Sequence, residues 1–104
     1  SGLQEKDFTY VKDAARWIIA LARHDDALPY NVFNIAGDMR CTVRAFATAI
    51  ASRFDLKDIL RFGEISRPLD EPDNGMADTT RLVSVIGTLS PTPFEQALTE
   101  TTNL

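Results

Sequence analysis

Cysteine and histidine, the side chains that most readily act as nucleophile and general base near neutral pH, are scarce in this 104-residue chain. It has one cysteine, Cys41, and one histidine, His24. Neither Tyr10 nor Tyr30 is followed by a lysine four residues later, so a Tyr-Lys acid-base pair on one helix face is absent. A serine or cysteine nucleophile needs a base, and only His24 could serve. Because one histidine offers too few ligands for zinc, we interpret His24 and the acids after it as a polar helix end.

Cofactor and metal sites are not predicted either. The five glycines are too scattered to form a loop that lets the backbone approach a pyrophosphate. Residues 70–75 are faintly similar to a calcium loop, but Pro72 stands where that pattern needs a ligand. Cys41 has no second cysteine or paired base and is predicted to pack as a small apolar side chain. We expect no catalytic, cofactor-binding or metal-binding residue in this chain.

Charge and hydropathy argue against two classes of partner. The chain has 11 basic and 15 acidic residues, a formal net charge of -4. A nucleic-acid binder needs a clustered excess of cations, whereas the cations here are dispersed from Lys6 to Arg81. The longest apolar run, Trp17 to Ala22, is too short to span a bilayer. We expect no nucleic-acid partner and no membrane partner.

Length and cysteine content predict one domain in a reducing compartment. The chain is long enough for one modest core, which we place at residues 3–104, and Ser1-Gly2 is expected to be a cloning remnant. A lone cysteine forms no intrachain disulfide, and Glu5 and Asp7 stand where a signal peptide has basic residues. A cytoplasmic location is therefore expected.

Hydropathy periodicity predicts alternating strands and helices. The predicted strands are residues 7–11, 31–36 and 59–65. The predicted helices are residues 12–24, residues after Thr42 through Phe54, a short helix after Asp78, and one after Thr92. This order is typical of an α/β fold: a small single domain with a short, mostly parallel sheet of about three strands and about four helices.

The predicted helix ends have side-chain signals. Thr42 and Asp78 are predicted N-caps, and Gly87 is predicted to end the third helix. Thr92 and Glu95 have the spacing of a capping box, in which each side chain bonds the backbone of the other. Six aromatic side chains on the apolar faces are predicted to be core: Phe8, Tyr10, Trp17, Phe33, Phe46 and Phe94.

Four segments carry a family pattern. Residues 6–15 are similar to Arg-Asp-Phe-x-aromatic-Val-Asp-Asp-Val-Ala, and residues 32–37 to Tyr-Asn-Ile-Gly. Residues 67–82 are similar to Arg-Pro-Gly-Asp-x-Pro followed by Ala-Asp-Thr-Ser-Lys-Leu, and residues 86–98 to a closing Leu-Gly-Trp-x-Pro helix. In this order the chain resembles the C-terminal part of the extended short-chain dehydrogenase/reductase family, the NAD(P)-dependent nucleotide-sugar epimerases, dehydratases and reductases.

The resemblance implies a substrate-binding lobe. In that family this part closes over the nucleotide sugar, while a Rossmann half supplies NAD(P) and the catalytic Tyr and Lys. Carried over, Arg67 would hold the substrate diphosphate, because a planar guanidinium suits two phosphate oxygens. Lys6 would be a second, weaker diphosphate contact, and Asp70 would orient Arg67 or the turn rather than touch the ligand. The lobe would then bind substrate without being catalytic alone.

Departures from the family pattern keep a second hypothesis open. Lys12 replaces an acid, Leu69 replaces the turn glycine, and the 70–77 loop is one residue longer. A stand-alone protein-interaction domain derived from this lobe would tolerate these changes. An isolated lobe is expected to expose the apolar patch that the Rossmann half covers, with Tyr10 and Trp17 as candidates for that surface and self-association as one outcome. A small hydrolase ranks last, since His24 has no convincing nucleophile partner.

Overall fold

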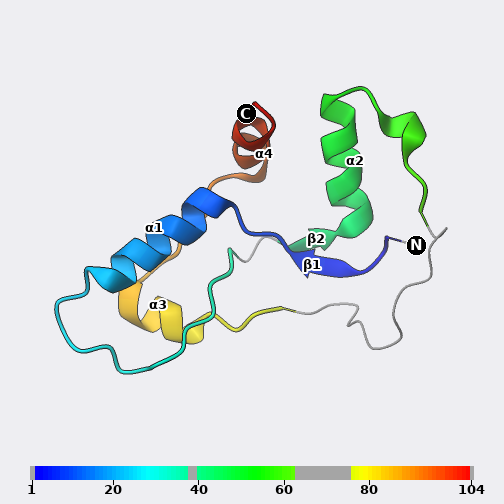
Figure 1. Cartoon of the computed structure of the whole chain (residues 1–104). Helices are drawn as coiled ribbons and strands as arrows, with labels where there is room; N and C mark the ends of the chain where they lie inside the picture. The colour runs from blue at the N-terminus through cyan, green and yellow to red at the C-terminus, as the bar shows by residue number, and fades with distance from the viewer. Residues whose placement is uncertain (1, 38–39, 63–75, 104) are drawn as a thin grey trace. The chain divides into compact units, whose positions relative to one another are not determined.

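A computed structural model describes residues 2–37, 40–62 and 76–103 of the chain (Figure 1). The chain divides into two compact units. The sheet unit consists of Ser1–Lys6 and Arg40–Gly75, and the helical unit of Asp7–Met39 and Met76–Leu104. Among the described residues, no helix has the length and hydropathy needed to cross a membrane.

The sheet unit is built on two short strands, β1 (Glu5–Asp7) and β2 (Arg40–Thr42). They run antiparallel, and the register continues past their ends. The Val43 amide donates to the Gln4 carbonyl at 3.0 Å, and the Arg44 amide to the Gly2 carbonyl at 2.7 Å. Across the pair, Arg40 Nε lies 3.3 Å from a carboxylate oxygen of Glu5. Such a short ribbon needs packing from other elements to be stable.

Helix α2 (Val43–Arg53) supplies that packing together with the 3-10 turn η1 (Lys57–Ile59). Its N-cap is Thr42, whose Oγ1 accepts a hydrogen bond from the Ala45 amide at 3.0 Å. Near its first turn, the Arg44 guanidinium lies 4.1 Å from the centroid of the Phe62 ring. Gly2 fits against the same ring with a φ of +74°, where a Cβ would lie 2.7 Å from it. Because it has no Cβ, only glycine tolerates both the positive φ and this close approach of the ring.

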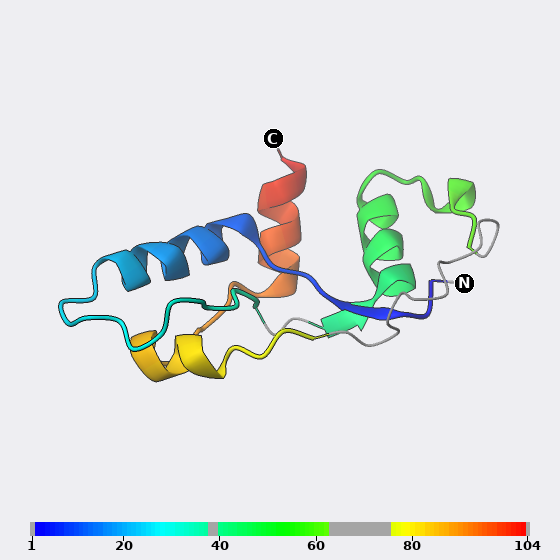
Figure 2. The ribbon, with the colours of Figure 1, turned by 60° about the horizontal axis from the view of Figure 1, so that its bottom comes forward.

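The helical unit contains α1 (Val11–Ala22), α3 (Thr80–Ile86) and α4 (Phe94–Thr102). Helix α1 lies beside α3, and the non-helical segment 32–37 runs along them (Figure 2). The most deeply buried apolar side chains are Trp17 and Leu82, at 2% and 0% exposure. A Cβ on Gly37 would lie 3.5 Å from the Trp17 ring, so the chain passes close under the indole.

The predicted fold class is wrong. A mostly parallel sheet of three strands was expected, whereas the described residues form one antiparallel pair, and the fold is mixed and helix-rich. The first strand lies earlier than predicted, at the polar residues of β1, and residues 32–37 are in no strand. Residues 57–59 form η1, and 63–65 lie outside the described residues. Alternating hydropathy indicates a half-buried segment, but a strand also needs a neighbour with free backbone groups.

The four helices were predicted more accurately than the strands. Thr42 caps α2 as expected, and α3 ends at Gly87, which has a φ of +85°. The capping box at α4 is wrong, because the N-cap is Pro93 and Thr92 bonds a residue of α1 instead. Of the six aromatic side chains predicted to be core, Trp17 is buried and the others are half-buried. Burying the indole also removes Trp17 from the surface proposed to face a missing half.

Candidate functional site

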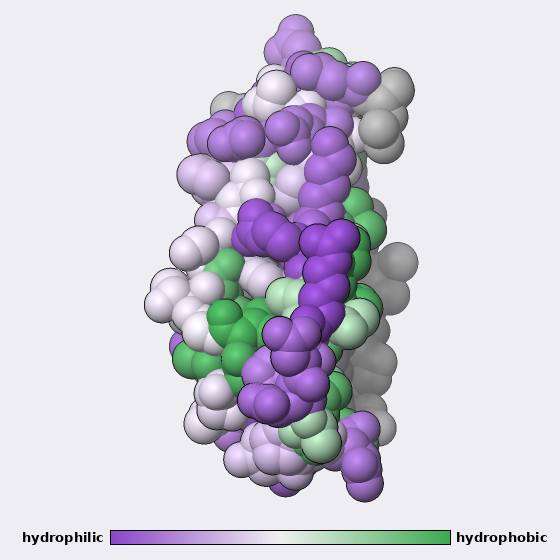
Figure 3. Space-filling view, turned by 90° about the vertical axis from the view of Figure 1, so that its left-hand side faces the viewer, coloured by the Kyte–Doolittle hydropathy of each residue, from purple (hydrophilic) through white to green (hydrophobic). Residues whose placement is uncertain are grey.

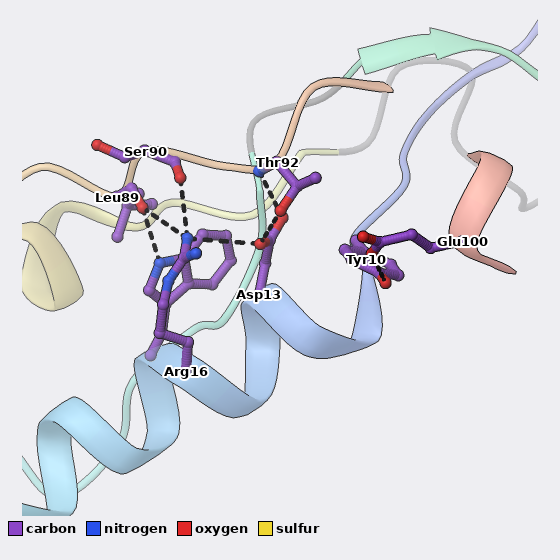
Figure 4. A network of polar contacts seen from close by, with 8 residues as sticks. Tyr10, Asp13, Arg16, Leu89, Ser90, Thr92 and Glu100 are labelled. Carbon is purple, nitrogen blue, oxygen red and sulfur yellow. Dashed lines mark hydrogen bonds and ion pairs between the residues drawn. The ribbon is translucent and has the colours of Figure 1, made fainter. Parts of the chain in front are cut away.

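The most strongly organised polar cluster lies where α1 meets the chain before α4, inside the helical unit (Figure 4). Its centre is Asp13, a carboxylate that is only 1% exposed. The Thr92 amide donates to Asp13 Oδ2 at 2.8 Å, and the Thr92 hydroxyl donates to Oδ1 at 2.6 Å. Arg16 Nη2 lies 3.4 Å from Oδ1. Burying a carboxylate without such donors is costly, and with them Asp13 is a structural anchor.

Two further side chains of α1 bind the backbone of the same segment. Arg16 Nη2 donates to the Ser90 carbonyl at 2.8 Å and to the Leu89 carbonyl at 3.3 Å. Trp17 Nε1 donates to the Leu89 carbonyl at 2.9 Å. Ser90 has a φ of +48°, which a non-glycine residue rarely adopts. The hydrogen bonds from Arg16 and Trp17 to the Leu89 and Ser90 carbonyls hold this turn in place.

Tyr10 and Glu100 form a second polar contact, at the start of α1 and on α4 (Figure 4). The Tyr10 hydroxyl donates to Glu100, and Lys12 Nζ lies 3.9 Å from the same carboxylate. Hydrogen bonding to Glu100 raises the pKa of Tyr10 to about 12, and burial and the negative charge of Glu100 act in the same direction. The bond from Tyr10 in turn lowers the pKa of Glu100. A tyrosine with a raised pKa is a poor general base at neutral pH.

A small pocket of about 230 Å³ opens where segment 32–37 meets α3. It is lined by Val32, Asn34, Asp78 and Arg81. Asn34 Nδ2 donates to the Asp78 carbonyl at 3.0 Å, and the Arg81 guanidinium lies 4.7 Å from the centroid of the Tyr30 ring.

The charges around this pocket do not suit a diphosphate. Bonds from the Thr80 hydroxyl and amide lower the pKa of Asp78, which keeps that carboxylate ionised beside Arg81. Among the described residues that line it, one acid and one base therefore share the wall, without the cationic excess that a dianionic ligand needs.

Of the two predicted substrate-binding residues, Lys6 is in the part of the chain that the structure describes and Arg67 is not. Lys6 lies in β1 and is half-buried. Arg67 and Asp70 lie outside the described residues. Within residues 2–37, 40–62 and 76–103, no group of three His, Cys, Asp or Glu side chains is arranged to hold a metal ion. His24 is exposed just beyond the end of α1, and Cys41 is half-buried in β2, where burial raises the pKa of its thiol.

Sequence reasoning missed two features of the polar architecture. Thr92 was interpreted only as part of a capping box, so its contact with Asp13 across 79 positions was not predicted. Asp7 is the other case, because both of its carboxylate oxygens are buried without a hydrogen-bond partner in the described structure. Nothing in the hydropathy pattern around Asp7 signals this.

Comparison with known proteins leaves the resemblance untested, since no family model, no curated protein and no solved structure matches the chain.

Proposed function

We propose that this chain is the substrate-binding lobe of an NAD(P)-dependent nucleotide-sugar epimerase, dehydratase or reductase, and that it is not catalytic alone. The proposal rests on the four family-like segments, which follow one another in the family's order between Lys6 and Leu98. A fold or motif alone does not fix a reaction, so the proposal names a substrate class and leaves the reaction to the missing half.

Contacts between these segments support the proposal. The Gly37 amide of the second segment donates to Thr9 Oγ1 of the first at 3.2 Å. Asn34 of the second segment donates to the Asp78 carbonyl of the third at 3.0 Å. The carboxylate of Asp13, in the first segment, binds Thr92 between Gly87 and the α4 helix of the fourth. Residues that carry the resemblance are thus also residues that hold the helical unit together.

Exposed apolar side chains on α1 support the idea that a further part of the enzyme covers this unit. Val11 is 72% exposed and Ile18 is 54% exposed. At about 100° per residue they lie within about 20° of each other, on a face of α1 turned away from Trp17. On the side that Figure 3 draws, hydrophobic residues are exposed among strongly hydrophilic ones. A Rossmann half that binds NAD(P) is the partner we propose for this face.

In this proposal Arg67 holds the substrate diphosphate and Lys6 adds a weaker contact. A guanidinium offers two parallel N–H donors to phosphate oxygens, whereas an ammonium acts as a point charge. The negative overall charge makes placed cations necessary, because the field of the whole chain repels a diphosphate.

Calorimetric titration with UDP-glucose, dTDP-glucose and GDP-mannose tests the proposal. At least one of these nucleotide sugars is expected to bind, and Arg67→Ala is expected to raise its Kd about tenfold or more, since a charge-assisted bond is lost. Arg53→Ala, at the end of α2, is the matched control and should leave the Kd unchanged. No binding of any of the three, or binding indifferent to Arg67→Ala, contradicts the proposal.

The same exposed apolar face favours a second candidate, a protein-interaction domain without sugar binding. Light scattering and a hydrophobic dye distinguish the two. An interaction domain is expected to bind the dye, or to self-associate, and to show no heat with the nucleotide sugars.

A further inference from the structure

The small pocket between segment 32–37 and α3 has one negative and one positive side chain on its wall. These are Asp78 and Arg81, and Val32 and Asn34 complete the lining. No ion pair joins Asp78 to Arg81 among the described residues, although both line the same pocket. Opposite charges that are not bonded to each other can each bind a charged group of a ligand.

The Asp78 carboxylate is held through one of its two oxygens. Asp78 Oδ1 accepts a hydrogen bond from the Thr80 amide at 2.9 Å and another from the Thr80 hydroxyl at 2.6 Å. Hydrogen bonding from Thr80, and to a lesser extent the charge of Arg81, lowers the pKa of Asp78, so the carboxylate is ionised at neutral pH. In the part of the chain that the structure describes, Asp78 Oδ2 has no hydrogen-bond partner. That oxygen can accept a bond from a ligand.

The Arg81 guanidinium is held by an aromatic pair. It lies 4.7 Å from the centroid of the Tyr30 ring, which meets the Phe33 ring edge-on with the two centroids 5.9 Å apart. Arg81 Nη1 also donates to the Val32 carbonyl at 3.4 Å. Within residues 2–37, 40–62 and 76–103, Arg81 Nε and Nη2 have no hydrogen-bond partner. These two donors form the planar fork that binds a carboxylate through two parallel bonds.

Asn34 and Val32 supply the neutral part of the wall. Asn34 Nδ2 donates to the Asp78 carbonyl at 3.0 Å, and Asn34 Oδ1 has no partner in the described structure. Val32 is 66% exposed and provides an apolar surface. The volume of about 230 Å³ is that of about eight water molecules, so a ligand of about eight non-hydrogen atoms fills it.

We propose that this pocket binds a free α-amino acid with an aliphatic side chain. The carboxylate of the amino acid accepts the two bonds of the Arg81 fork. Its ammonium group donates to Asp78 Oδ2 and Asn34 Oδ1, and its side chain lies against Val32. Valine and leucine are ligands of the required size. One acid and one base on the wall match the two opposite charges that such a zwitterion carries.

The same charges argue against other classes of small ligand. A divalent cation needs several oxygen ligands, whereas Asp78 supplies the one carboxylate among the described lining residues, and Arg81 repels a cation. A phosphate is repelled by Asp78. A purely apolar ligand takes water from both charges without replacing its hydrogen bonds, which is costly.

Titration of the unaltered chain with L-valine and L-leucine, followed by nitrogen-15 NMR, tests the proposal. At least one of the two is expected to bind saturably and to shift the amide signals of Val32, Asn34 and Arg81. N-acetyl-leucine lacks the ammonium charge and leucinamide lacks the carboxylate, so each is expected to bind about tenfold or more weakly than L-leucine. No saturable shift with either amino acid up to about 20 mM, or an equal Kd for either analogue, overturns the proposal.

Two variants assign each charge of the ligand to its residue. Arg81→Gln is expected to raise the Kd of L-leucine about tenfold or more and to leave that of leucinamide unchanged. Asp78→Asn is expected to weaken L-leucine in the same way and to leave N-acetyl-leucine unchanged, and its amide oxygen can still accept the bonds from Thr80. Arg23→Gln and Asp26→Asn, exposed and outside the pocket, are the matched controls and should leave every Kd unchanged. Unchanged binding of L-leucine to the Arg81→Gln chain overturns the proposal.

Two further probes separate related ligands. Sodium acetate that binds as tightly as L-leucine would mean a site for an anion only, and glycyl-leucine that binds more tightly would mean a site for peptides. Either result overturns the proposal. Because the analogues are compared on the unaltered chain, the test does not depend on the folding of a variant. The assays contain no nucleotide sugar, so their outcome is independent of the proposed substrate-binding function.

Discussion

Asp13 shows how one polar side chain can set the arrangement of a small unit. Its carboxylate is 1% exposed and receives two donors from Thr92 and the charge of Arg16. Thr92 comes 79 positions later in the chain, so the cluster fixes α1 against the residues before α4. Truncating one partner of a buried charged network leaves the others without bonds, which costs more than the network contributes.

Asp13→Ala is therefore expected to lower the free energy of unfolding by about 3 kcal/mol, measured by urea denaturation with far-UV circular dichroism. Asp26→Ala, at an exposed position after α1, is the control and should change it by less than about 0.5 kcal/mol. In a double-mutant cycle, Asp13→Ala and Thr92→Val should be strongly non-additive. Additive effects would show that the contact does not stabilise the native state.

The Tyr10–Glu100 contact makes a prediction about pH. Its hydrogen bond raises the pKa of Tyr10 from 10.0 to about 12. The neutral phenol is thus favoured in the folded state, so its stabilisation is complete below pH 10 and is lost as pH rises through about 12. The pKa of Glu100 is lowered in the folded state. The stabilisation that Glu100 contributes is therefore present above its ordinary pKa and is lost as pH falls through the lowered pKa.

Absorbance of the phenolate at 295 nm checks this prediction in a Tyr30→Phe background, where Tyr10 is the remaining tyrosine. The titration midpoint is expected near pH 12, and Glu100→Gln should move it toward 10. A midpoint that Glu100→Gln leaves unchanged would mean that the carboxylate is not what holds the proton.

At the scale of elements, helices were predictable because their signals are local, and strands were not. The Thr42 hydroxyl, three residues before the amide it binds, is visible in the sequence and does cap α2. Thr92 carries the same signal but binds Asp13, because a buried carboxylate competes for its hydroxyl. The alternating apolar residues 32–36 predict a strand. The strands that pair are instead β1 and β2, and no local sequence pattern predicts a strand at either place.

Of the candidate site, the sequence indicated the residue types but not their placement. Arg67 and Lys6 came from a resemblance, and the exposed apolar face of α1 was not located, although Val11 and Ile18 are evident in the sequence. Its signal is the seven-residue spacing of Val11 and Ile18, which is about two helical turns. Which face of α1 is buried depends on Asp13 and Trp17 finding distant partners, and those contacts are not written in the segment itself.

The N-cap of α2 contributes to the stability of the chain, and this contribution can be measured. Thr42→Ala is expected to lower the free energy of unfolding by about 1 kcal/mol, since the Ala45 amide loses its acceptor. Thr99→Ala is the matched control. The Thr99 hydroxyl bonds the Glu95 carbonyl within α4, and alanine is the better helix former, so no loss is expected. Equal losses in chemical denaturation would contradict a specific role for the cap.

Viewed as a whole, the chain leaves much of its apolar surface uncovered. Among residues 2–37, 40–62 and 76–103, the large hydrophobic residues exposed by more than a third are Leu3, Val11, Ile18, Ile19, Leu28, Tyr30, Val32, Phe54, Leu56, Ile59, Met76 and Val83. Single exposed apolar residues are ordinary, but several on one helix mark an interaction surface. The proposed Rossmann half would bury α1 residues that its own unit leaves in water.

If α1 has an outer face meant for a partner, a polar residue there should not weaken the isolated chain. Ile18→Glu is expected to change the free energy of unfolding by less than about 0.5 kcal/mol and to lower the fluorescence of a bound hydrophobic dye. Leu82→Ala is the contrasting variant: this side chain is fully buried, and its truncation should cost about 3 kcal/mol. Chemical denaturation and dye titration measure both. A loss at Ile18 comparable to that at Leu82 would place Ile18 in the core of this chain and remove the α1 face from the surfaces that await a partner.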